Sequence, residues 1–302
     1  MVGTIMNMDG ATSMTEDTHT FGDGRLAASV RAHGAELCAL RADGRDLLWC
    51  GGDPWRRQSP VLFPIVGRLV DDAAWVDGQA YRMTQHGFAR DCTFRWLERD
   101  ETGCRLELSD TDATRRIYPF AFSLVIEYRI EQGRLRVGYC VTNPDANRVL
   151  PASLGAHPAF VWPLAADVPK DRHIIEFDQP EPEGVRRLKD GLLLPESFPT
   201  PVVGRVLHLD ESLFAADALI FDRPASTGLT YRIPDGPGLR LTWEGFPQLG
   251  IWMKPGADFV CIEPWHGMAS PVGFKGDFST RPGVFHLQPG QEWRASWQVG
   301  CI

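Results

Sequence analysis

The sequence predicts an all-β protein built from two packed antiparallel sheets, in the form of a large sandwich or a barrel. Apolar and polar residues alternate with a period of two in several segments, and 30 glycines and 23 prolines punctuate the chain. No window keeps apolar residues at i, i+3, i+4 and i+7 over three helical turns, so helix should be scarce. Many short strands divided by turns are typical of packed sheets rather than of a parallel α/β fold.

The clearest strands lie near the middle of the chain. Every second residue of 122–130 is apolar, and after a turn at 131–133 the alternation resumes in 134–142. Together these segments predict an antiparallel hairpin. The Pro-rich, charged run from Gln179 to Pro201 is expected to be a long surface excursion. Further strands are expected at 104–110, 173–177, 218–221, 239–243 and 259–263.

Length and composition indicate one globular domain. A chain of 302 residues buries roughly three quarters of its unfolded surface. Its 43% hydrophobic and 23% charged residues are ordinary values for a soluble protein. Residues 1–20 lack the basic and apolar regions of a secretory signal, and we expect a flexible tail. Residues 21–302 then form a single domain.

Charge and cysteine usage limit the partners. A formal net charge of −8 repels a phosphate backbone, so nucleic acid is not an expected partner. No apolar stretch approaches the length of a membrane span. The seven cysteines are scattered without C-x-x-C spacing, which indicates reduced thiols in the cytoplasm. Both a monomer and a homodimer are compatible with the sequence.

Three short segments place ionisable side chains among aromatic and apolar ones. They are QHGFAR (85–90), LGAHPAF (154–160) and VCIEPWHG (260–267), and they contain His86, His157 and Glu263. Each of these residues alone is more often structural than catalytic. One carboxyl and two imidazoles together suit a reaction that takes a proton from one oxygen and delivers one to another, such as the opening of a sugar ring.

Other site types have weaker support. Glu263 and His266 have the E-x-x-H spacing of metal ligands, but in an extended chain their side chains point to opposite faces. The sequence has no phosphate-binding G-x-x-x-x-G-K-[ST] loop, no G-x-S-x-G elbow and no strand followed by G-x-G-x-x-G. Nucleotide binding and serine hydrolysis are therefore not expected.

Four motifs together resemble the aldose 1-epimerase (galactose mutarotase) superfamily, in its divergent bacterial epimerase-like branch. They are SPVLFPIVGRL (59–69), QHGFARD (85–91), LGAHPAF (154–160) and CIEPWHG (261–267), in the order and approximate separation of that branch. The similarity runs from about residue 26 to the C-terminus. It implies a large antiparallel β-sandwich, the galactose mutarotase-like supersandwich, with an open cleft and no metal or cofactor in catalysis.

The resemblance also implies catalytic roles. Glu263 matches the base that takes the proton from the anomeric hydroxyl, and His157 matches the acid that protonates the ring oxygen. His86 matches a second histidine that hydrogen-bonds near that oxygen. The implied activity is aldose 1-epimerase (mutarotase), which interconverts the α and β anomers of a hexose by ring opening and reclosure.

Two sugar-binding positions are implied as well. Arg68 matches an arginine that contacts sugar hydroxyls, although V-G-R departs from the N-R form of galactose mutarotases and leaves the hexose unspecified. Asp217 is the best match for a sugar-binding aspartate, with Asp222 as its competitor.

Three other functions are open. A hexose-6-phosphate mutarotase needs a cationic cluster, to which Arg68, Arg90 and Lys254 could contribute. A non-catalytic carbohydrate-binding or sensing protein needs no matched acid and base. A jelly-roll metal enzyme would carry bound metal.

Overall fold

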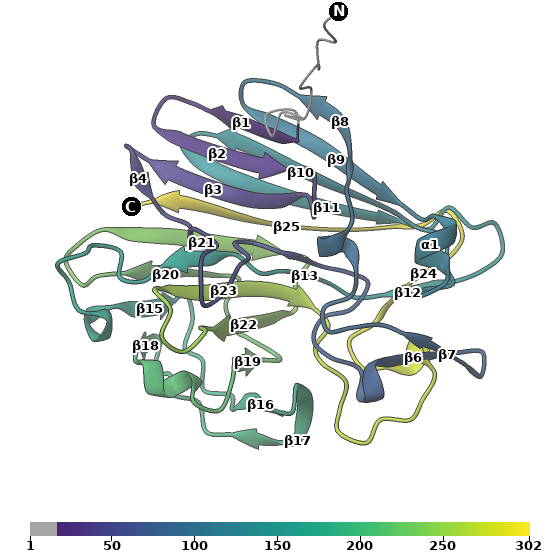
Figure 1. Cartoon of the computed structure of the whole chain (residues 1–302). Coiled ribbons are helices and arrows are strands. Elements are labelled where there is room, and N and C mark those ends of the chain that lie inside the picture. The colour runs from purple at the N-terminus through teal and green to yellow at the C-terminus, as the bar shows by residue number, and fades with distance from the viewer. Residues whose placement is uncertain (1–16) are drawn as a thin grey trace, which may run out of the picture.

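The computed structural model describes residues 17–302 and shows an all-β molecule (Figure 1). Within this range the chain forms strands β1 to β25 and one α-helix, α1 (Asp112–Arg115). Short 3₁₀ turns account for the remaining helical residues: η1 (Val70–Asp72), η2 (Ala89–Asp91), η3 (Lys170–Arg172), η4 (Glu211–Phe214) and η5 (Phe278–Thr280). The predicted fold class is confirmed.

The larger of the two main sheets has nine antiparallel strands. The predicted central hairpin is present, because β10 and β11 pair along their whole length. In order across the sheet the strands are β18 (Val206–His208), β15 (Ile174–Phe177), β20 (Gly228–Arg232), β21 (Gly238–Glu244), β25 (Glu292–Cys301), β11 (Arg134–Thr142), β10 (Ser123–Glu131), β9 (Gly103–Ser109) and β8 (Arg95–Arg99).

The second main sheet has eight strands. β23 lies near its middle, pairs with β22 on one side and with both β13 and β14 on the other, and crosses the centre of Figure 1 beside β22. The strands are β17 (Leu192–Phe198), β16 (Val185–Lys189), β19 (Leu219–Phe221), β22 (Gln248–Trp252), β23 (Phe259–His266), β13 (Leu154–Ala156), β14 (Ala159–Val161) and β5 (Val61–Leu62).

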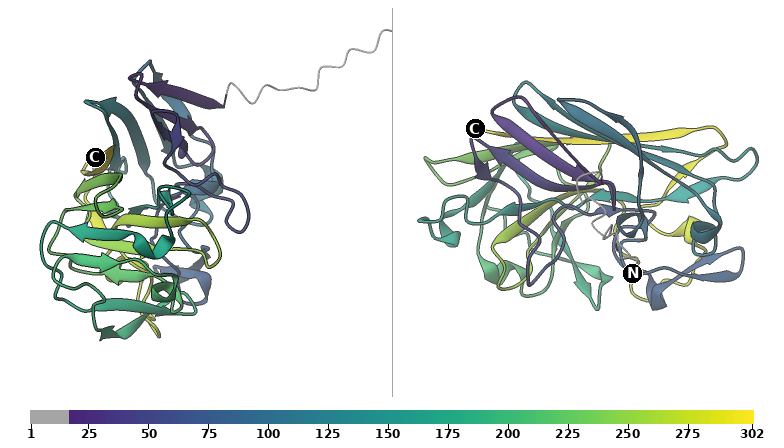
Figure 2. Two further views of the ribbon diagram at one scale, coloured as in Figure 1. Left: turned by 90° about the vertical axis from the view of Figure 1, so that its left-hand side faces the viewer. Right: turned by 45° about the horizontal axis from the view of Figure 1, so that its top comes forward.

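Smaller sheets complete the architecture. A four-stranded sheet lies at the end of the molecule opposite β16 and β17, as both views of Figure 2 also show. It consists of β1 (Thr18–Gly22), β2 (Leu26–Arg31), β3 (Glu36–Ala42) and β4 (Arg45–Asp46). Two ribbons are formed by β6 (Ala73–Val76) with β7 (Gln79–Arg82), and by β12 (Leu150–Ala152) with β24 (Phe285–Leu287).

One continuous apolar core joins these sheets. The alternation of β10 and β11 predicts which side chains enter it: Leu124, Ile126 and Tyr128 are buried on β10, as are Val137 and Val141 on β11. The core also takes alternate residues of β22, β23 and the four-stranded sheet. Each main sheet therefore turns one face to the core, and its other face is available for a site.

Two predictions of local structure need correction. The run from Gln179 to Pro201 is not a mere surface excursion, because β16 and β17 lie within it and extend the eight-stranded sheet to its edge. The strand expected at 259–263 continues to His266, so Glu263 lies inside the strand rather than at its end.

The structure covers only part of the predicted N-terminal tail. Residues 1–16 of the expected tail lie outside the described residues, and β1 already begins at Thr18. A single domain over 21–302 stays a prediction. Within residues 17–302, no helix combines the length and apolar character needed to cross a bilayer.

Candidate active site

Strand β23 turns its two sets of side chains to different environments. Val260 and Ile262 enter the main core, as alternation along a strand requires. Cys261, Glu263 and Trp265 point to the opposite face of the eight-stranded sheet. That face is covered by two smaller apolar clusters, so seven of the eight residues of β23 are buried. A carboxyl is thus held on a rigid strand and largely shielded from water.

The register of β13 and β14 places His157 opposite this carboxyl. Gly155 pairs with Trp265, and Ala159 pairs with Cys261. The register does not shift between these two pairs, and His157 is midway between Gly155 and Ala159. His157 therefore faces Glu263 across the sheet, on the same side. The Nε2 atom of His157 lies 3.2 Å from Oε2 of Glu263. The two predicted proton carriers are therefore brought together by strand pairing.

His86 reaches the same place from a turn. Its φ of 68° lies in the left-handed region, which non-glycine residues rarely adopt. The turn is held because the His86 amide donates to the Gly67 carbonyl at 2.8 Å and the Gly67 amide donates to Nδ1 of His86 at 3.1 Å. Since Nδ1 accepts this hydrogen bond, the neutral ring carries its own hydrogen on Nε2. The His86 and His157 rings meet edge to face, 5.7 Å apart.

Gly67 has to be a glycine for this contact. Its φ is 73°, and a Cβ there would lie 2.5 Å from the Cα of Ala269. The close approach of Gly67 to the chain after β23 positions the amide that fixes His86.

These side chains line a cavity of about 300 Å³ on the outer face of the eight-stranded sheet. The walls include four of the five site residues predicted from sequence: His86, His157, Asp217 and Glu263. The rest of the lining is Trp55, Val66, Gly67, Gln85, Arg90, Leu188, Ala218, Ile220, Trp252, Trp265 and Ala269.

Arg68, the fifth predicted residue, is not part of this lining. Its Nε donates to Oδ1 of Asp72 at 2.7 Å, and Nη1 donates to the carbonyl of Asp190 at 3.2 Å. Of the two candidate aspartates, Asp217 lines the cavity and Asp222 does not. Asp222 instead pairs with Arg186 at 3.4 Å.

Sequence reasoning gave no role to the aromatic side chains that enclose His157. The Trp55 ring stacks on the imidazole with centroids 5.3 Å apart, and Trp252 meets it edge-on at 5.7 Å. Trp55 comes from a polar loop far from any predicted strand. Its large aromatic side chain was the only sequence signal of a place in a site. Arg90, within the QHGFAR motif, is the one cationic side chain in the lining, and it donates to the Gln85 carbonyl at 2.6 Å.

Burial shifts the protonation of the whole cluster. It raises the pKa of Glu263 well above the ordinary value, and it lowers the pKa values of His157 and His86 below theirs. The Trp265 indole opposes the rise at Glu263 without reaching hydrogen-bond geometry. Burial also lowers the pKa of the Arg90 guanidinium to about 10.

Four buried polar atoms of the cavity-lining residues have no hydrogen-bond partner within residues 17–302. They are Nε of Arg90, Nδ1 of His157, Oε2 of Glu263 and Nε1 of Trp265. Most buried polar groups in proteins are satisfied, and unsatisfied ones concentrate at functional sites. The wall thus offers both donors and acceptors to a polar ligand.

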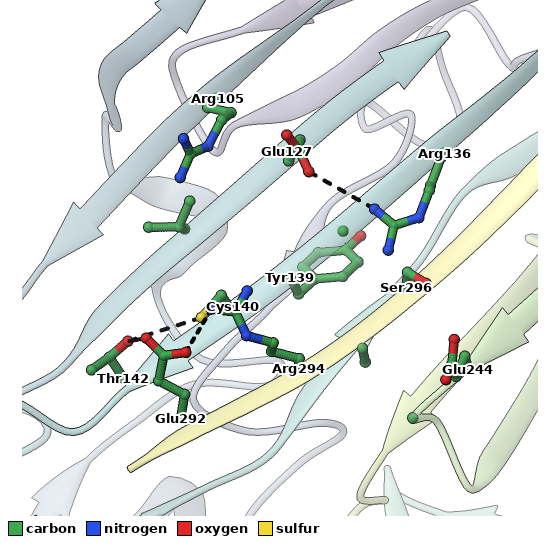
Figure 3. A pocket seen from close by; sticks show the side chains of 14 residues that line it. Arg105, Glu127, Arg136, Tyr139, Cys140, Thr142, Glu244, Glu292, Arg294 and Ser296 are labelled. Carbon is green, nitrogen blue, oxygen red and sulfur yellow. Dashed lines mark hydrogen bonds and ion pairs between the residues drawn. The ribbon is translucent and has the colours of Figure 1, made fainter. Parts of the chain in front are cut away.

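A larger hollow, of about 480 Å³, lies on the outer face of the nine-stranded sheet (Figure 3). Four of its charged residues form two pairs: Arg136 lies 3.8 Å from Glu127, and Arg294 donates to Glu292 at 2.6 Å. It contains no histidine and no buried carboxyl. The smaller cavity is therefore the better candidate for an active site.

Glu263 and His266, which have the spacing of metal ligands in the sequence, do not come together in the structure. His266 lies on the opposite face of β23 from Glu263, against the rings of Phe285 and Trp293. Potential ligand atoms of His157, Cys261 and Glu263 instead lie within 4.8 Å of one another.

The fold is a galactose mutarotase-like β-sandwich. The sequence model of the aldose 1-epimerase family matches residues 17–298, and the chain belongs to this family. The resemblance inferred from the four motifs is confirmed.

Several known proteins are similar over nearly their whole length. The protein LacX of Lactococcus lactis subsp. lactis, encoded on a plasmid, is 29% identical over 92% of this chain and 97% of its own. A galactose mutarotase related enzyme from Lactobacillus acidophilus has a TM-score of 0.86 at 28% identity, covering 94% of this chain and 97% of its own. A galactose mutarotase-like protein from Lactobacillus casei ATCC 334 has a TM-score of 0.87 at 27% identity, covering 94% and 100%.

Proposed function

We propose that this protein is an aldose 1-epimerase that interconverts the α and β anomers of a free hexose. The observation that carries the proposal is the cross-strand pair of His157 and Glu263, 3.2 Å apart in the wall of a cavity with polar and aromatic sides. Family membership supports a carbohydrate epimerase, and the closeness of a carboxyl and an imidazole supports an acid–base reaction.

In the proposed reaction Glu263 takes the proton of the anomeric hydroxyl while His157 gives a proton to the ring oxygen. The bond between the anomeric carbon and the ring oxygen breaks, and the anomeric carbon becomes an aldehyde. Rotation of the aldehyde presents its other face. Reclosure forms the carbon–oxygen bond again, returns one proton to His157 and takes the other from Glu263.

This cycle needs one proton in total on the pair. The starting state holds it on the imidazole beside an ionised carboxyl, and ring opening transfers it, through the sugar, to Glu263. Burial disfavours both charges, as the raised pKa of Glu263 and the lowered pKa of His157 indicate. The uncharged pair that accompanies the open-chain sugar is therefore favoured, and the same burial promotes ring opening.

The remaining walls suit the recognition of hydroxyl groups. His86 presents Nε2–H as a donor beside His157, and Arg90 adds a guanidinium. Asp217 supplies an acceptor. The rings of Trp252 and Trp265 offer apolar faces for the C–H surface of a pyranose.

A free hexose fits the charges better than a phosphorylated one. The cavity lining has two carboxyls, Asp217 and Glu263, against the single guanidinium of Arg90. The other proposed phosphate contacts, Arg68 and Lys254, are not in the lining. Anomer-exchange rates on glucose and glucose 6-phosphate, measured by NMR, would reverse this assignment if the phosphate ester reacted faster.

The decisive test is Glu263→Gln, which keeps the shape of the side chain and removes the base. We expect anomer exchange of freshly dissolved α-glucose or α-galactose, followed by polarimetry, to fall by roughly 10²-fold or more. Glu244→Gln is the matched control, because Glu244 lines the other hollow, and it should retain the parent rate.

Two results would count against the proposal. A Glu263→Gln variant as fast as the parent would remove Glu263 as the base. Tight sugar binding by a parent protein that does not accelerate anomer exchange would instead favour a carbohydrate-binding or sensing role.

The proposal includes the cytoplasm as the compartment and a small sugar as the only required ligand. All seven cysteines are free. A reducing compartment keeps thiols in this state.

A further inference from the structure

We propose that the active site also binds a thiophilic divalent cation, such as Zn²⁺ or Cd²⁺, through Cys261, His157 and Glu263, and that this cation inhibits the enzyme. The inhibition rests on the function proposed above, whereas the binding does not. The cation has no part in catalysis.

Strand geometry places the three donors on one face. Cys261 and Glu263 are two residues apart on β23 and so point to the same side of the sheet. His157 lies directly across from Glu263, and its neighbour Ala159 pairs with Cys261. Their potential ligand atoms all lie within 4.8 Å of one another.

These separations are close to those around zinc. Bond lengths of about 2.0–2.3 Å place the donor atoms of a tetrahedral site roughly 3.3–3.8 Å apart. The Nε2 to Oε2 distance of 3.2 Å between His157 and Glu263 is near this range. The Cys261 sulfur needs a shift of about 1 Å at most to complete three corners. The fourth corner can face the cavity, which His157 and Glu263 line.

The donor set is incompletely satisfied by the protein itself. Oε2 of Glu263 has no hydrogen-bond partner within residues 17–302, although the side chain is only 1% exposed. A carboxylate oxygen and an imidazole nitrogen both satisfy a cation. A buried carboxylate oxygen is therefore free to bind a cation.

The ligand types select the kind of cation. Thiolate and imidazole favour zinc and its soft relatives, whereas Mg²⁺ and Ca²⁺ prefer sites made of oxygen. Binding releases the thiol proton of Cys261 and the proton shared by His157 and Glu263. The same lone pairs can no longer exchange protons with a sugar, so metal binding and anomer exchange exclude one another.

Cys261 permits a selective test because it is not in the cavity lining and has no role in the proposed reaction. The parent protein is titrated with Cd²⁺, and binding is followed by the ultraviolet charge-transfer absorption of the cadmium–thiolate bond. Cys261→Ala and Cys261→Ser are compared with Cys140→Ser, whose thiol lies in the other hollow. Circular dichroism shows which variants fold.

We expect one Cd²⁺ equivalent of this absorption to disappear in both Cys261 variants and to remain in Cys140→Ser. The Cd²⁺ concentration for half-inhibition, relative to each variant's metal-free rate, should rise at least tenfold in the Cys261 variants. EDTA should restore the parent rate, and Mg²⁺ should have no effect.

The failures are distinguishable. Unchanged Cd²⁺ absorption in folded Cys261 variants would overturn the metal site, whatever the enzymatic activity. If the Cys261 variants lose the absorption but the metal-free parent does not accelerate anomer exchange, the metal site is supported and the proposed function is rejected. Absorption lost but inhibition unchanged would refute the inhibitory role.

Discussion

At the scale of single residues, the central feature is the Glu263 carboxyl, whose ionisation is disfavoured by burial. The pKa of Glu263 is raised in the folded protein, while the unfolded chain gives its ordinary value near 4.5. As pH rises above that value the unfolded state loses the proton first, so stability decreases through the folded-state pKa. The buried Glu263 side chain therefore costs stability at neutral and alkaline pH.

Glu263→Gln should consequently be more stable than the parent above about pH 5, and the difference should grow with pH until the folded-state pKa is passed. Each unit by which burial raises the pKa corresponds to about 1.4 kcal/mol, so a higher Tm of the variant is expected at alkaline pH. Thermal unfolding from about pH 4 to pH 9 measures it. Parallel Tm curves for the two proteins would contradict the burial argument.

Arg90→Gln should raise the KM for the sugar by roughly tenfold, since hydrogen bonds from charged groups contribute about 1.5–3 kcal/mol. Arg68→Gln is its control and should leave KM unchanged, because the Arg68 side chain pairs with Asp72 outside the cavity lining. Initial rates over a range of sugar concentrations give both values. A larger effect at Arg68 would restore the role implied by the family resemblance.

The two arginines show why sequence alone placed some residues and not others. Glu263 stands on β23, where alternation fixes the face that a side chain occupies, and His157 lies in the short break between β13 and β14, which both pair with β23. Arg68 has a long side chain next to a turn that offers Asp72 as a partner, and no local pattern says whether it points to the cavity or to that carboxylate. The sequence-based reading of Asp217 over Asp222 agrees with the position of the cavity.

At the scale of elements, the site depends on which strands allow a bulky ring above them. Gly250 pairs with Glu263, and the Trp265 indole lies over it. A Cβ at Gly250 would lie 2.3 Å from Cη2 of Trp265, closer than any contact allows. The missing side chain on β22 thus gives Trp265 its place in the cavity wall.

Gly250→Ala should therefore displace the Trp265 ring, lower kcat/KM severalfold and destabilise the fold by about 1–3 kcal/mol. Gly138→Ala is the matched control on β11, because a Cβ there meets only the mobile end of the Arg136 side chain, at 3.1 Å. Urea unfolding and the anomer-exchange rate measure the two effects. Equal behaviour of both variants would mean that the indole moves freely.

The two misread segments have physical explanations. β17 is the last strand of its sheet, and natural edge strands carry charges and proline that prevent further pairing. Pro195 and the charges around it therefore resembled a loop. On β23, Pro264 indicated an end to the strand, but proline removes only one hydrogen bond and its extended backbone still fits the sheet.

At the scale of the whole molecule, alternation predicted two packed sheets but not their strand order. β25, at the C-terminus, lies between β11 and β21, and each partner is distant in sequence. Pairings of this kind leave no local signal, because any two alternating segments can form a ladder. The sequence likewise could not predict which face of each main sheet packs in the core and which face carries the cavity.

Core and site should respond separately to substitution. Ile262→Val removes one methylene from the core face of β23 and should lower stability by about 1 kcal/mol, with kcat/KM unchanged. Ile262 is fully buried and adjacent to Glu263 in the chain, yet it points the other way. Denaturant unfolding and anomer exchange check both parts, and an altered KM would show that the two faces are coupled.

Glu263 stands on β23 and His157 lies in the short break between β13 and β14, which both pair with β23, whereas His86, Arg90 and Asp217 come from turns and loops. During evolution these connecting segments can be exchanged or lengthened without disturbing the paired strands beneath them. Descendants of one ancestral gene could thus have acquired different sugar preferences while inheriting the same chemistry. Diversification of substrate among such proteins should be recorded in their loops and not in the sheet.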